Sequence, residues 1–383
     1  MTSFRFVQVH TLTSYPAVLL NRDDAGMAKR LPYGGASRLR ISSQCLKRHW
    51  RKTEKDTQWE LAAIGAPLAE RSRHVVEREI FPSAPGVPDD VVKAVQTALV
   101  KKLYGKDNVA VKSRQALLLG RPEIDYLACI ARQAAATGSV KAAEAAIETA
   151  LGKGDGKTNL AAMTKLAGNL AAGLESALFG RMVTSDPEAN TDAAIHVAHA
   201  FSVHAEETES DYFTVVDDLA RTEDGEVGSA GMFDTELTSG LFYGYVVIDV
   251  PGLVDNLGGD RALAGKVVEH LLHLIATVSP GAKKGSTAPY AYAELMLIEL
   301  GMAQPRSLAG AFRRPVPFNG DVLNEALAAL AGQLGRFDAA YGGTEQRAAL
   351  ATADIALPGV AAPVGLDALA AWAAAAVRGV EAG

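Results

Sequence analysis

The sequence is poor in cysteine: Cys45 and Cys129 are the only two in 383 residues. Two cysteines exclude a disulfide framework and a cysteine-ligated metal knuckle, and since both lie in apolar helical patterns, we predict that they are small core residues. No run approaches the roughly 18 apolar residues of a membrane-spanning helix. The N-terminal residues Met1–Arg5 lack the apolar core of a signal peptide. We therefore expect a cytoplasmic protein with no membrane partner.

Sequence motifs of catalysis are missing as well. No Gly-x-Ser-x-Gly nucleophile turn occurs. The segment Gly152–Thr158 is similar to a phosphate-binding loop, but Leu151 stands where that motif needs its first glycine. The segment also follows an alanine-rich helical pattern rather than a strand. We interpret it as a polar loop and not as a nucleotide site.

The histidines do not form a recognisable metal motif. His196 and His204 share one face of a predicted strand and His199 lies on the other, with no carboxylate or cysteine at ligand spacing. His270 and His273 are three residues apart on a predicted helix, without the His-Glu-x-x-His order of a zinc site. We expect solvated or hydrogen-bonded core histidines, no metal and no cofactor.

Adjacent carboxylates leave one enzymatic alternative open. The pairs Asp23-Asp24 and Asp217-Asp218 offer oxygen ligands of the kind that Mg²⁺ accepts, although such pairs more often are solvated or cap helices. A metal-dependent nuclease that uses Asp23, Asp24 or the histidines is the alternative to our prediction of a protein that is not an enzyme. Metal-dependent cleavage of RNA or DNA by the pure protein would favour the nuclease.

The sequence does have a concentration of positive charge. Between Lys29 and Lys55 there are nine Lys or Arg residues and one acidic residue, Glu54, in a chain whose net charge is −6. Such a concentration is unfavourable unless an anion accepts it. The acidic whole argues against a chain that binds nucleic acid everywhere, and the cluster argues for one local basic groove.

The pattern from Gln44 to Lys52 predicts an amphipathic helix, which Ser42 or Ser43 is placed to cap. At 3.6 residues per turn the side chains divide into two faces. The basic face contains Gln44, Lys47, Arg48, Arg51 and Lys52, and the apolar face contains Cys45, Leu46, His49 and Trp50. We expect the apolar face to dock on a core and the basic face to hold nucleic-acid phosphates. A merely solvated basic surface is the alternative.

Patterns of apolar residues predict both strands and helices. Strands are expected at Phe4–Thr13, Arg38–Ile41, Ile195–His204, Leu241–Val250 and Leu295–Leu300, and a loop at Leu19–Leu31. Helices are expected at Asp89–Tyr104, Arg114–Ala136, Val140–Leu151, Leu160–Leu178, Arg261–Thr277, Asp321–Arg336 and Leu366–Val380. This succession predicts an α+β fold with a split domain of ferredoxin-like type. The polar segment Ala205–Ser239 is too long for an ordinary connection.

Several blocks of sequence carry a resemblance to a known family. The central block is Arg40–Arg51, of the form Arg-Ile-Ser-Ser-Gln-x-Leu-Lys-Arg-x-x-Arg. The others are Leu20–Asp24, Gly26–Lys29, Gly180–Met182, Asp211–Leu219, Ser239–Tyr243 and Pro280–Lys283. In this order and over most of the chain, they resemble the CasC family, the backbone subunit of the type I-E CRISPR surveillance complex (Cascade).

The resemblance implies an architecture. It implies a modified RNA-recognition-motif (RRM) palm of ferredoxin-like type, an inserted helical finger domain and a protruding thumb hairpin. On this sequence the palm is expected at residues 1–55 and 180–300 and the fingers at 56–179. The thumb is expected at about 204–238, and a C-terminal helical segment, 301–383, completes the palm.

The resemblance also implies a function without catalysis. Several copies polymerise along a CRISPR guide RNA (crRNA), hold its phosphates and present its bases to target DNA in antiviral defence. The RNA-gripping positions fall on Asn21, Arg22, Lys29, Gln44, Lys47, Arg48, Arg51, Arg181 and Lys283. The implied partners are the crRNA, target DNA, further copies in a helical filament, and the other Cascade subunits: large, small, front-end capping subunit and guide-processing endonuclease. A generic single-strand RNA-binding protein is the plainer alternative.

An apolar wedge is the last feature that the resemblance implies, and it falls on Met182 and Phe213. Apolar side chains suit a wedge because they replace base stacking without needing water. Judged from the residues alone, Met182 is a core residue and Phe213 anchors a loop to its own domain. The sequence departs from the family at Ala36 and Ser37, where relatives are basic, and at Cys45, where a serine is common. The loop Val183–Thr191 is also shorter.

Overall fold

The computed structural model describes residues 4–53, 58–83, 85–105, 108–151, 170–183, 187–216, 229–282 and 284–379. The chain divides into two compact units. Unit 1 comprises Met1–Glu60, Val197–Val247 and Val268–Gly383, and unit 2 comprises Leu61–His196 and Ile248–Val267. The predicted palm, finger and thumb boundaries remain predictions; most of the predicted fingers fall in unit 2.

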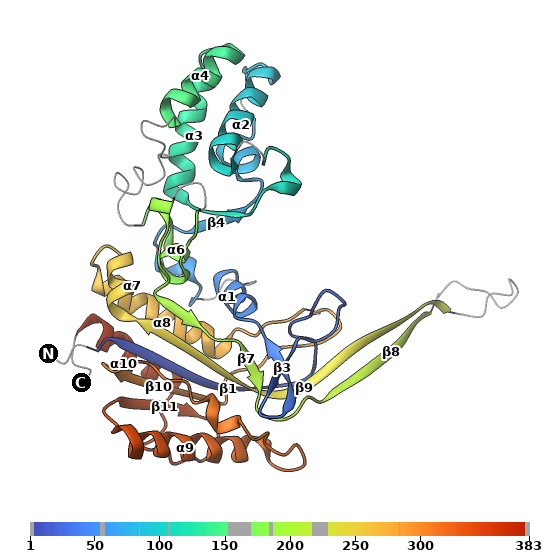
Figure 1. The fold of residues 1–383 in the computed structure, drawn as a ribbon, viewed down its shortest axis with the longest axis vertical. Helices are drawn as coiled ribbons and strands as arrows, with labels where there is room; N and C mark the ends of the chain where they lie inside the picture. The colour runs from blue at the N-terminus through green and yellow to red at the C-terminus, as the bar shows by residue number, and fades with distance from the viewer. Residues whose placement is uncertain are drawn as a thin grey trace, which may run out of the picture. The chain divides into compact units, whose positions relative to one another are not determined.

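A sheet forms the framework of unit 1, with the strand order β11-β10-β1-β9-β7-β3-β2 (Figure 1). The strands are β1 (Phe6–Val18), β2 (Arg30–Tyr33), β3 (Ala36–Ile41), β7 (Ala200–Ser202), β9 (Ser229–Asp249), β10 (Leu295–Gly301) and β11 (Gln346–Ala351). β1 pairs antiparallel with β10, so that Phe6 lies opposite Gly301 and Leu12 opposite Leu295. β6 (Ile195–Val197) also pairs with β9.

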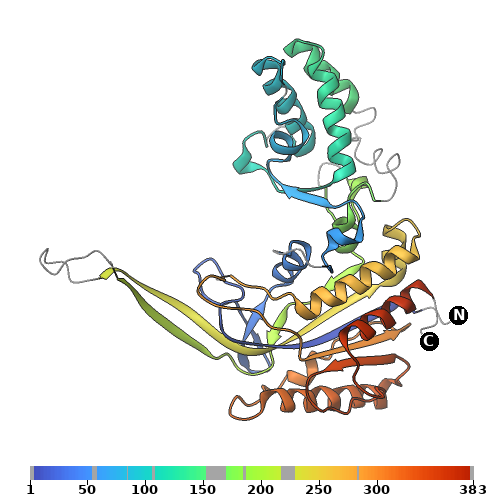
Figure 2. The ribbon, with the colours of Figure 1, turned by 180° about the vertical axis from the view of Figure 1, so that it is seen from behind.

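Helices cover both faces of this sheet. α9 (Val322–Tyr341) lies on one face, and α10 (Leu366–Arg378) and the C-terminal part of α8 (Arg261–Thr277) lie on the other (Figures 1 and 2). The α9 face forms one apolar core, in which Leu330 packs in the same cluster as Leu12 and Tyr243. The short helix η6 (Ala309–Phe312) adds Phe312 to it. Apolar burial of this kind stabilises the sheet at roughly 25 cal/mol per Å² removed from water.

A second apolar cluster lies beneath α1 (Ser43–Arg51). Its buried members come from β1, β3, β7, β9 and the loop after β1: Tyr15, Val18, Leu19, Leu20, Ala28, Leu39, Ile41, Ala200 and Phe242. Cys45 and Leu46 of α1, together with Ala282 and Ala291 of the loop before β10, pack against it. The predicted docking of the apolar helix face is therefore confirmed.

β8 (Thr208–Val216) and the first half of β9 form a long antiparallel hairpin, with Thr208 opposite Thr238 and Phe213 opposite Phe233. The residues from Thr208 to Thr214 are all exposed. The root is fixed because Arg30 forms ion pairs with both Glu206 and Glu236. The hairpin ribbon is thus anchored at its base, and its strand β8 is exposed from Thr208 to Thr214.

Unit 2 is mainly helical. α2 (Asp89–Tyr104), α3 (Arg121–Ala135) and α4 (Val140–Leu151) share a core that includes Leu99, Leu127 and Ile147. β4 (Ala69–Ser72) pairs antiparallel with β5 (Leu117–Gly120). The remaining elements are η1 (Leu61–Ile64), η2 (Val76–Ile80), η3 (Val111–Ser113), α6 (Leu174–Phe179), η4 (Pro187–Ala189) and α7 (Val250–Asn256).

The predicted α+β class is confirmed, and the helices at Asp89–Tyr104, Val140–Leu151 and Arg261–Thr277 have the predicted bounds. The helix predicted from Arg114 begins only at Arg121, because the preceding residues form β5. The helix predicted at Leu160–Leu178 lies partly outside the described residues, and Gly152–Thr158 and Asp217-Asp218 lie wholly outside them. Within the described ranges, no helix combines the length and apolarity needed to cross a membrane.

The continuous strand predicted at Ile195–His204 is wrong. The structure has two short strands, β6 and β7, interrupted at Ala198-His199. The interruption frees His199 from the ladder, and its Nδ1 accepts a hydrogen bond from the backbone N–H of Ser43 at 3.0 Å. Part of the sheet hydrogen bonding is thus replaced by a contact that holds the start of α1.

Candidate nucleic-acid interface

The start of α1 is anchored from three segments of unit 1. Ser42 is the N-cap, and its side chain accepts a hydrogen bond from Cys45 N at 3.3 Å. The backbone N–H of Ser42 donates to Asn21 Oδ1 at 2.9 Å, and that of Ser43 donates to His199. The predicted serine cap is confirmed, and Asn21 serves the helix start as well as lying in the predicted interface.

The two faces of α1 differ in exposure as predicted. Gln44, Arg48 and Lys52 are exposed, and Lys47 and Arg51 are half-buried. His49 and Trp50 are buried. The basic side chains of α1 are therefore held along the surface by a helix whose other face is fixed in the core.

Cations from three segments converge at His199. Burial lowers the pKa of His199, and the charges of Arg40, Lys29 and Lys47 lower it further. Burial raises the pKa of the Cys45 thiol, and the charges of Arg48 and Lys29 act against that rise. We call Lys29, Arg40, Lys47, Arg48 and Arg51 the basic cluster. Positive charge gathered in this way attracts a polyanion.

The loop after β1 places two further predicted residues beside the basic cluster. Lys29 N donates to Asn21 O at 2.9 Å, and an isolated bridge joins exposed Arg22 to Ala28. The turn between them is held by Asp23, whose Oδ1 accepts hydrogen bonds from Ala25 N and Met27 N. Asn21, Arg22 and Lys29 therefore belong to one structured loop rather than to an open connection.

Two of the nine cations counted in the sequence serve the fold instead. Arg38 is fully buried and donates to the carbonyl oxygens of Ser202 and Phe312, each at 2.9 Å. Burial lowers its pKa. Arg30 holds the root of the hairpin through Glu206 and Glu236. The sequence count thus overstates the positive charge available to a ligand.

Arg181, a predicted RNA contact, is buried in unit 2. Its Nη1 lies 2.6 Å from Glu123 Oε2, and its Nη2 donates to Ala189 O at 2.8 Å. Its side chain is almost completely inaccessible. The structure does not support Arg181 as a phosphate contact, because the guanidinium is committed to this buried pair. Lys283 lies outside the described residues.

The two predicted wedge residues are both exposed. Met182 is 79% exposed, between the buried Arg181 and Val183, so the interpretation as a core residue is wrong. Phe213 is 38% exposed, and its neighbour Tyr212 is 62% exposed on the same strand. Since neighbouring strand residues point to opposite faces, the hairpin presents an aromatic ring on each side. Tyr212 is not among the predicted RNA-binding or wedge residues, although it lies in the block Asp211–Leu219.

Two of the histidines considered as metal ligands lie within hydrogen-bonding distance of backbone groups. His204 Nε2 accepts from Leu241 N at 3.2 Å, and His270 Nδ1 lies 3.1 Å from Trp59 O. Across the residues that the structure describes, no group of three or more His, Cys, Asp or Glu is placed to hold a metal ion.

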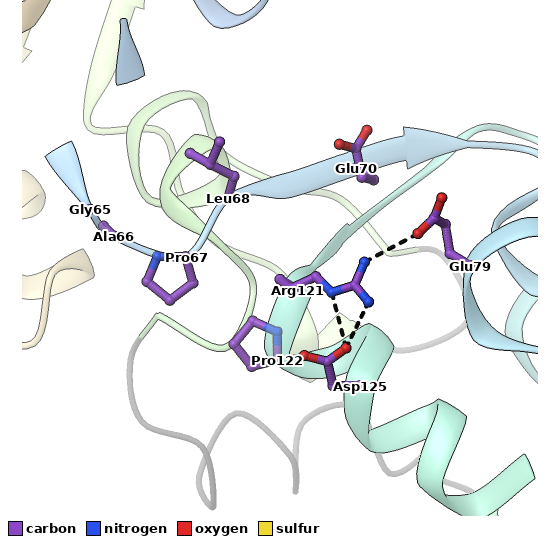
Figure 3. A pocket seen from close by; sticks show the side chains of 9 residues that line it. All are labelled: Gly65, Ala66, Pro67, Leu68, Glu70, Glu79, Arg121, Pro122 and Asp125. Carbon is purple, nitrogen blue, oxygen red and sulfur yellow. Dashed lines mark hydrogen bonds and ion pairs between the residues drawn. The ribbon is translucent and has the colours of Figure 1, made fainter. Parts of the chain in front are cut away.

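Two cavities have no residue of α1 in their lining. One, of about 590 Å³, is between the loop after β1 and the hairpin root, and it is lined by Arg22 and Met27 as well as by acidic Glu209, Asp234 and Glu236. The other, of about 520 Å³ in unit 2, contains Glu70, Glu79, Asp125 and Arg121 (Figure 3). There Arg121 pairs with Glu79 at 3.1 Å and with Asp125 at 3.0 Å. The acidic lining of both makes them poor phosphate sites.

The whole fold is similar to solved chains of RNA-guided complexes. One, described as "CRISPR RNA-guided surveillance complex, pre-nicking", is 26% identical with a TM-score of 0.79, and the match covers 97% of this chain and 100% of that one. Another, "CRISPR RNA-guided surveillance complex", is 23% identical with a TM-score of 0.68 and covers 96% and 99%, which shows the likeness of fold. Fold and site together define a subunit of a CRISPR surveillance complex.

The chain belongs to the CT1975-like protein family, whose model matches residues 7–372. This confirms the membership in the CasC family that the sequence blocks predicted. No curated protein matches the chain.

Proposed function

We propose that this chain is the crRNA-binding backbone subunit of a type I-E Cascade, and that the basic cluster holds the RNA phosphates. The observation that carries this proposal is the convergence of Lys29, Arg40 and Lys47 around His199. Lys47 belongs to α1, which also exposes Arg48. Lys and Arg neutralise phosphates without reading sequence, so base pairing with target DNA supplies specificity.

Assembly is the second part of the proposal. Several copies stack head to tail along one guide, a heterologous contact that propagates as a filament. The exposed ribbon of β8 and β9 acts as the thumb, and Phe213 and Met182 act as the wedge in the RNA stack. Target DNA and the remaining Cascade subunits join this filament, and the subunit itself has no catalytic role.

The test measures binding of single-stranded RNA to the nucleic-acid-stripped full chain over a salt series. Lys47→Glu/Arg51→Glu is expected to weaken binding for all sequences alike. Because each phosphate contact on a single strand contributes about 0.7 to the slope of log K against log salt, loss of two contacts lowers that slope by about 1.4. Fluorescence anisotropy with a labelled oligonucleotide gives both quantities.

The matched control is Lys101→Glu/Lys141→Glu, which makes the same change in charge at two exposed residues of α2 and α4 in unit 2. It should retain most of the affinity and the slope, and circular dichroism should show both variants folded. Equal losses in the two variants would mean that net charge and not the basic cluster governs binding. Unchanged binding in Lys47→Glu/Arg51→Glu would mean that the RNA binds at another surface than the basic cluster. Cleavage abolished by Asp24→Ala would favour the nuclease instead.

A further inference from the structure

Two tyrosines stand out among the large side chains of unit 1. Tyr290 and Tyr292 are 70% and 73% exposed, whereas Tyr15 and Tyr243 are buried. Neither exposed tyrosine makes a side-chain hydrogen bond, ion pair or ring contact with any residue that the structure describes. Two exposed aromatic rings so close in sequence form an uncovered apolar surface, which a bound ligand can bury.

The backbone that carries the two rings is fixed. Ser279 Oγ donates to Ala291 O and accepts from Ala291 N, both at 2.9 Å. Ala293 N donates to Ala276 O at 2.8 Å. Ala291, between the two tyrosines, packs against the apolar cluster beneath α1. The rings therefore project from an anchored segment, so little ordering of the backbone opposes binding.

This segment lies beside the loop after β1, which carries Lys29 of the basic cluster. Ala282 N donates to Leu19 O at 2.9 Å, and Ala282 and Ala291 share their apolar cluster with Leu46 of α1. The loop before β10 runs beside the loop after β1 in both ribbon views (Figures 1 and 2). The 14 residues Pro280–Ala293 contain Lys283 and Lys284 and no acidic residue. The segment itself therefore adds no negative charge that would repel an anionic strand.

The spacing of the rings suits a nucleobase. Exposure alternates over Tyr290, Ala291, Tyr292 and Ala293, as in an extended segment. Side chains two residues apart in an extended segment are about 6.6 Å apart. That separation is close to the space a single planar base needs between two stacked rings, and stacking of bases on tyrosine tolerates any sequence.

We propose that Tyr290 and Tyr292 form a stacking site for one nucleobase of the single-stranded RNA whose phosphates lie on the basic cluster. This inference rests on the proposed function. It adds a base contact, made by the loop before β10, to the phosphate contacts of the proposed function. It also accounts for the exposure of the two rings.

The test compares Tyr290→Ala/Tyr292→Ala with Tyr290→Phe/Tyr292→Phe in the full chain. Loss of a stacked base should weaken binding of a mixed-sequence RNA by about 5- to 150-fold, while the phenylalanine variant retains affinity. The slope of log K against log salt should stay unchanged, because stacking releases no counterions. RNA that contains 2-aminopurine should be quenched by the wild type and the phenylalanine variant, and not by the alanine variant.

Controls separate this site from the proposed function. Tyr341→Ala removes another tyrosine, 82% exposed near the end of α9, and should leave RNA affinity unchanged. An abasic RNA backbone should bind the wild type and the alanine variant equally. If the alanine variant binds intact RNA like the wild type while Lys47→Glu/Arg51→Glu does not, the stacking site is wrong and the phosphate groove stands. If neither variant loses affinity, the proposed function fails as well.

Discussion

At the scale of single residues, a buried polar network joins the strands of unit 1 through Glu299. This fully buried carboxylate accepts from Arg306 Nη1 at 2.5 Å and Arg347 Nε at 2.8 Å. His10 Nε2 lies 3.1 Å from Glu299, and His10 Nδ1 lies 2.9 Å from Tyr243 OH. Burial opposes the charge of Glu299, but the hydrogen bonds from Arg306 and His10 outweigh it and hold its pKa well below the usual range. The network therefore keeps an ionised carboxylate beneath α9.

This network predicts a dependence of stability on pH. Burial lowers the pKa of His10 below 6.5, outweighing the contact with Glu299. Below about pH 6.5 the unfolded chain binds a proton that the folded chain refuses, so stability falls as pH falls, by at most about 1.4 kcal/mol per pH unit. His10→Gln should reduce this dependence. Urea unfolding between pH 5 and 8 measures it.

The control for this prediction is His196→Gln, which removes an exposed histidine from unit 2 without touching the network. Some pH dependence should persist in His10→Gln, because burial also lowers the pKa of His204 and His273. The prediction is refuted if the free energy of unfolding of His10→Gln falls, as the pH is lowered, as steeply as that of the wild type.

At the scale of elements, α1 shows how much the sequence could predict. Its bounds, its cap and its two faces follow from local rules, because side-chain period and capping need only neighbouring residues. The burial of Arg38 does not follow from local rules, since its hydrogen-bond partners Ser202 and Phe312 lie far along the chain. The same holds for Arg181, whose buried partner is Glu123. A charge count cannot distinguish a phosphate contact from a buried ion pair.

Strands that were missed have a common cause. β2 begins within the predicted loop Leu19–Leu31, and β11 went unnoticed in an alanine-rich stretch, although both pair antiparallel with neighbours. β11 has the sequence Gln-Arg-Ala-Ala-Leu-Ala, which lacks β-branched residues. β11 is stabilised by its backbone pairing with β10 at the sheet edge, and not by the strand propensity of its residues. Tertiary context therefore decided these two strands, whereas local pattern was sufficient for β1, β10 and the long helices.

The cap of α1 gives a prediction at this scale. Ser42→Ala removes the oxygen that accepts from Cys45 N and should lower the free energy of unfolding by about 1 kcal/mol. Ser43→Ala is the matched control, because within the described ranges the Ser43 hydroxyl hydrogen-bonds only to the neighbouring Gln44 side chain, at 3.4 Å. Urea denaturation of both variants provides the comparison. A loss in Ser43→Ala equal to that in Ser42→Ala would show that the assigned cap is wrong.

At the scale of the whole molecule, the hairpin is the feature whose stability and exposure point to a partner outside the chain. A two-stranded ribbon is marginally stable in water, and the residues from Thr208 to Thr214 are uncovered. Its root, in contrast, is tied to the sheet domain by Arg30 and by Thr238 Oγ1, which donates to Val18 O at 2.7 Å. A fixed root with an uncovered arm is what a contact to another molecule requires, which favours the proposed filament.

The hairpin can therefore be shortened to separate assembly from RNA binding. Deletion of Tyr212–Asp234, with Asp211 joined to its register partner Thr235 by an Asn-Gly turn, retains Glu236 and Thr238 at the root. A short RNA that holds one copy should bind the shortened chain as it binds the wild type, since the basic cluster is intact. On RNAs of increasing length, native mass spectrometry should show wild-type copies added at regular intervals and irregular, incomplete filling by the shortened chain. Regular filling by both would mean that contacts outside the hairpin set the spacing, and the proposed thumb would lose its role; loss of binding to the short RNA would instead place part of the RNA interface on the hairpin itself.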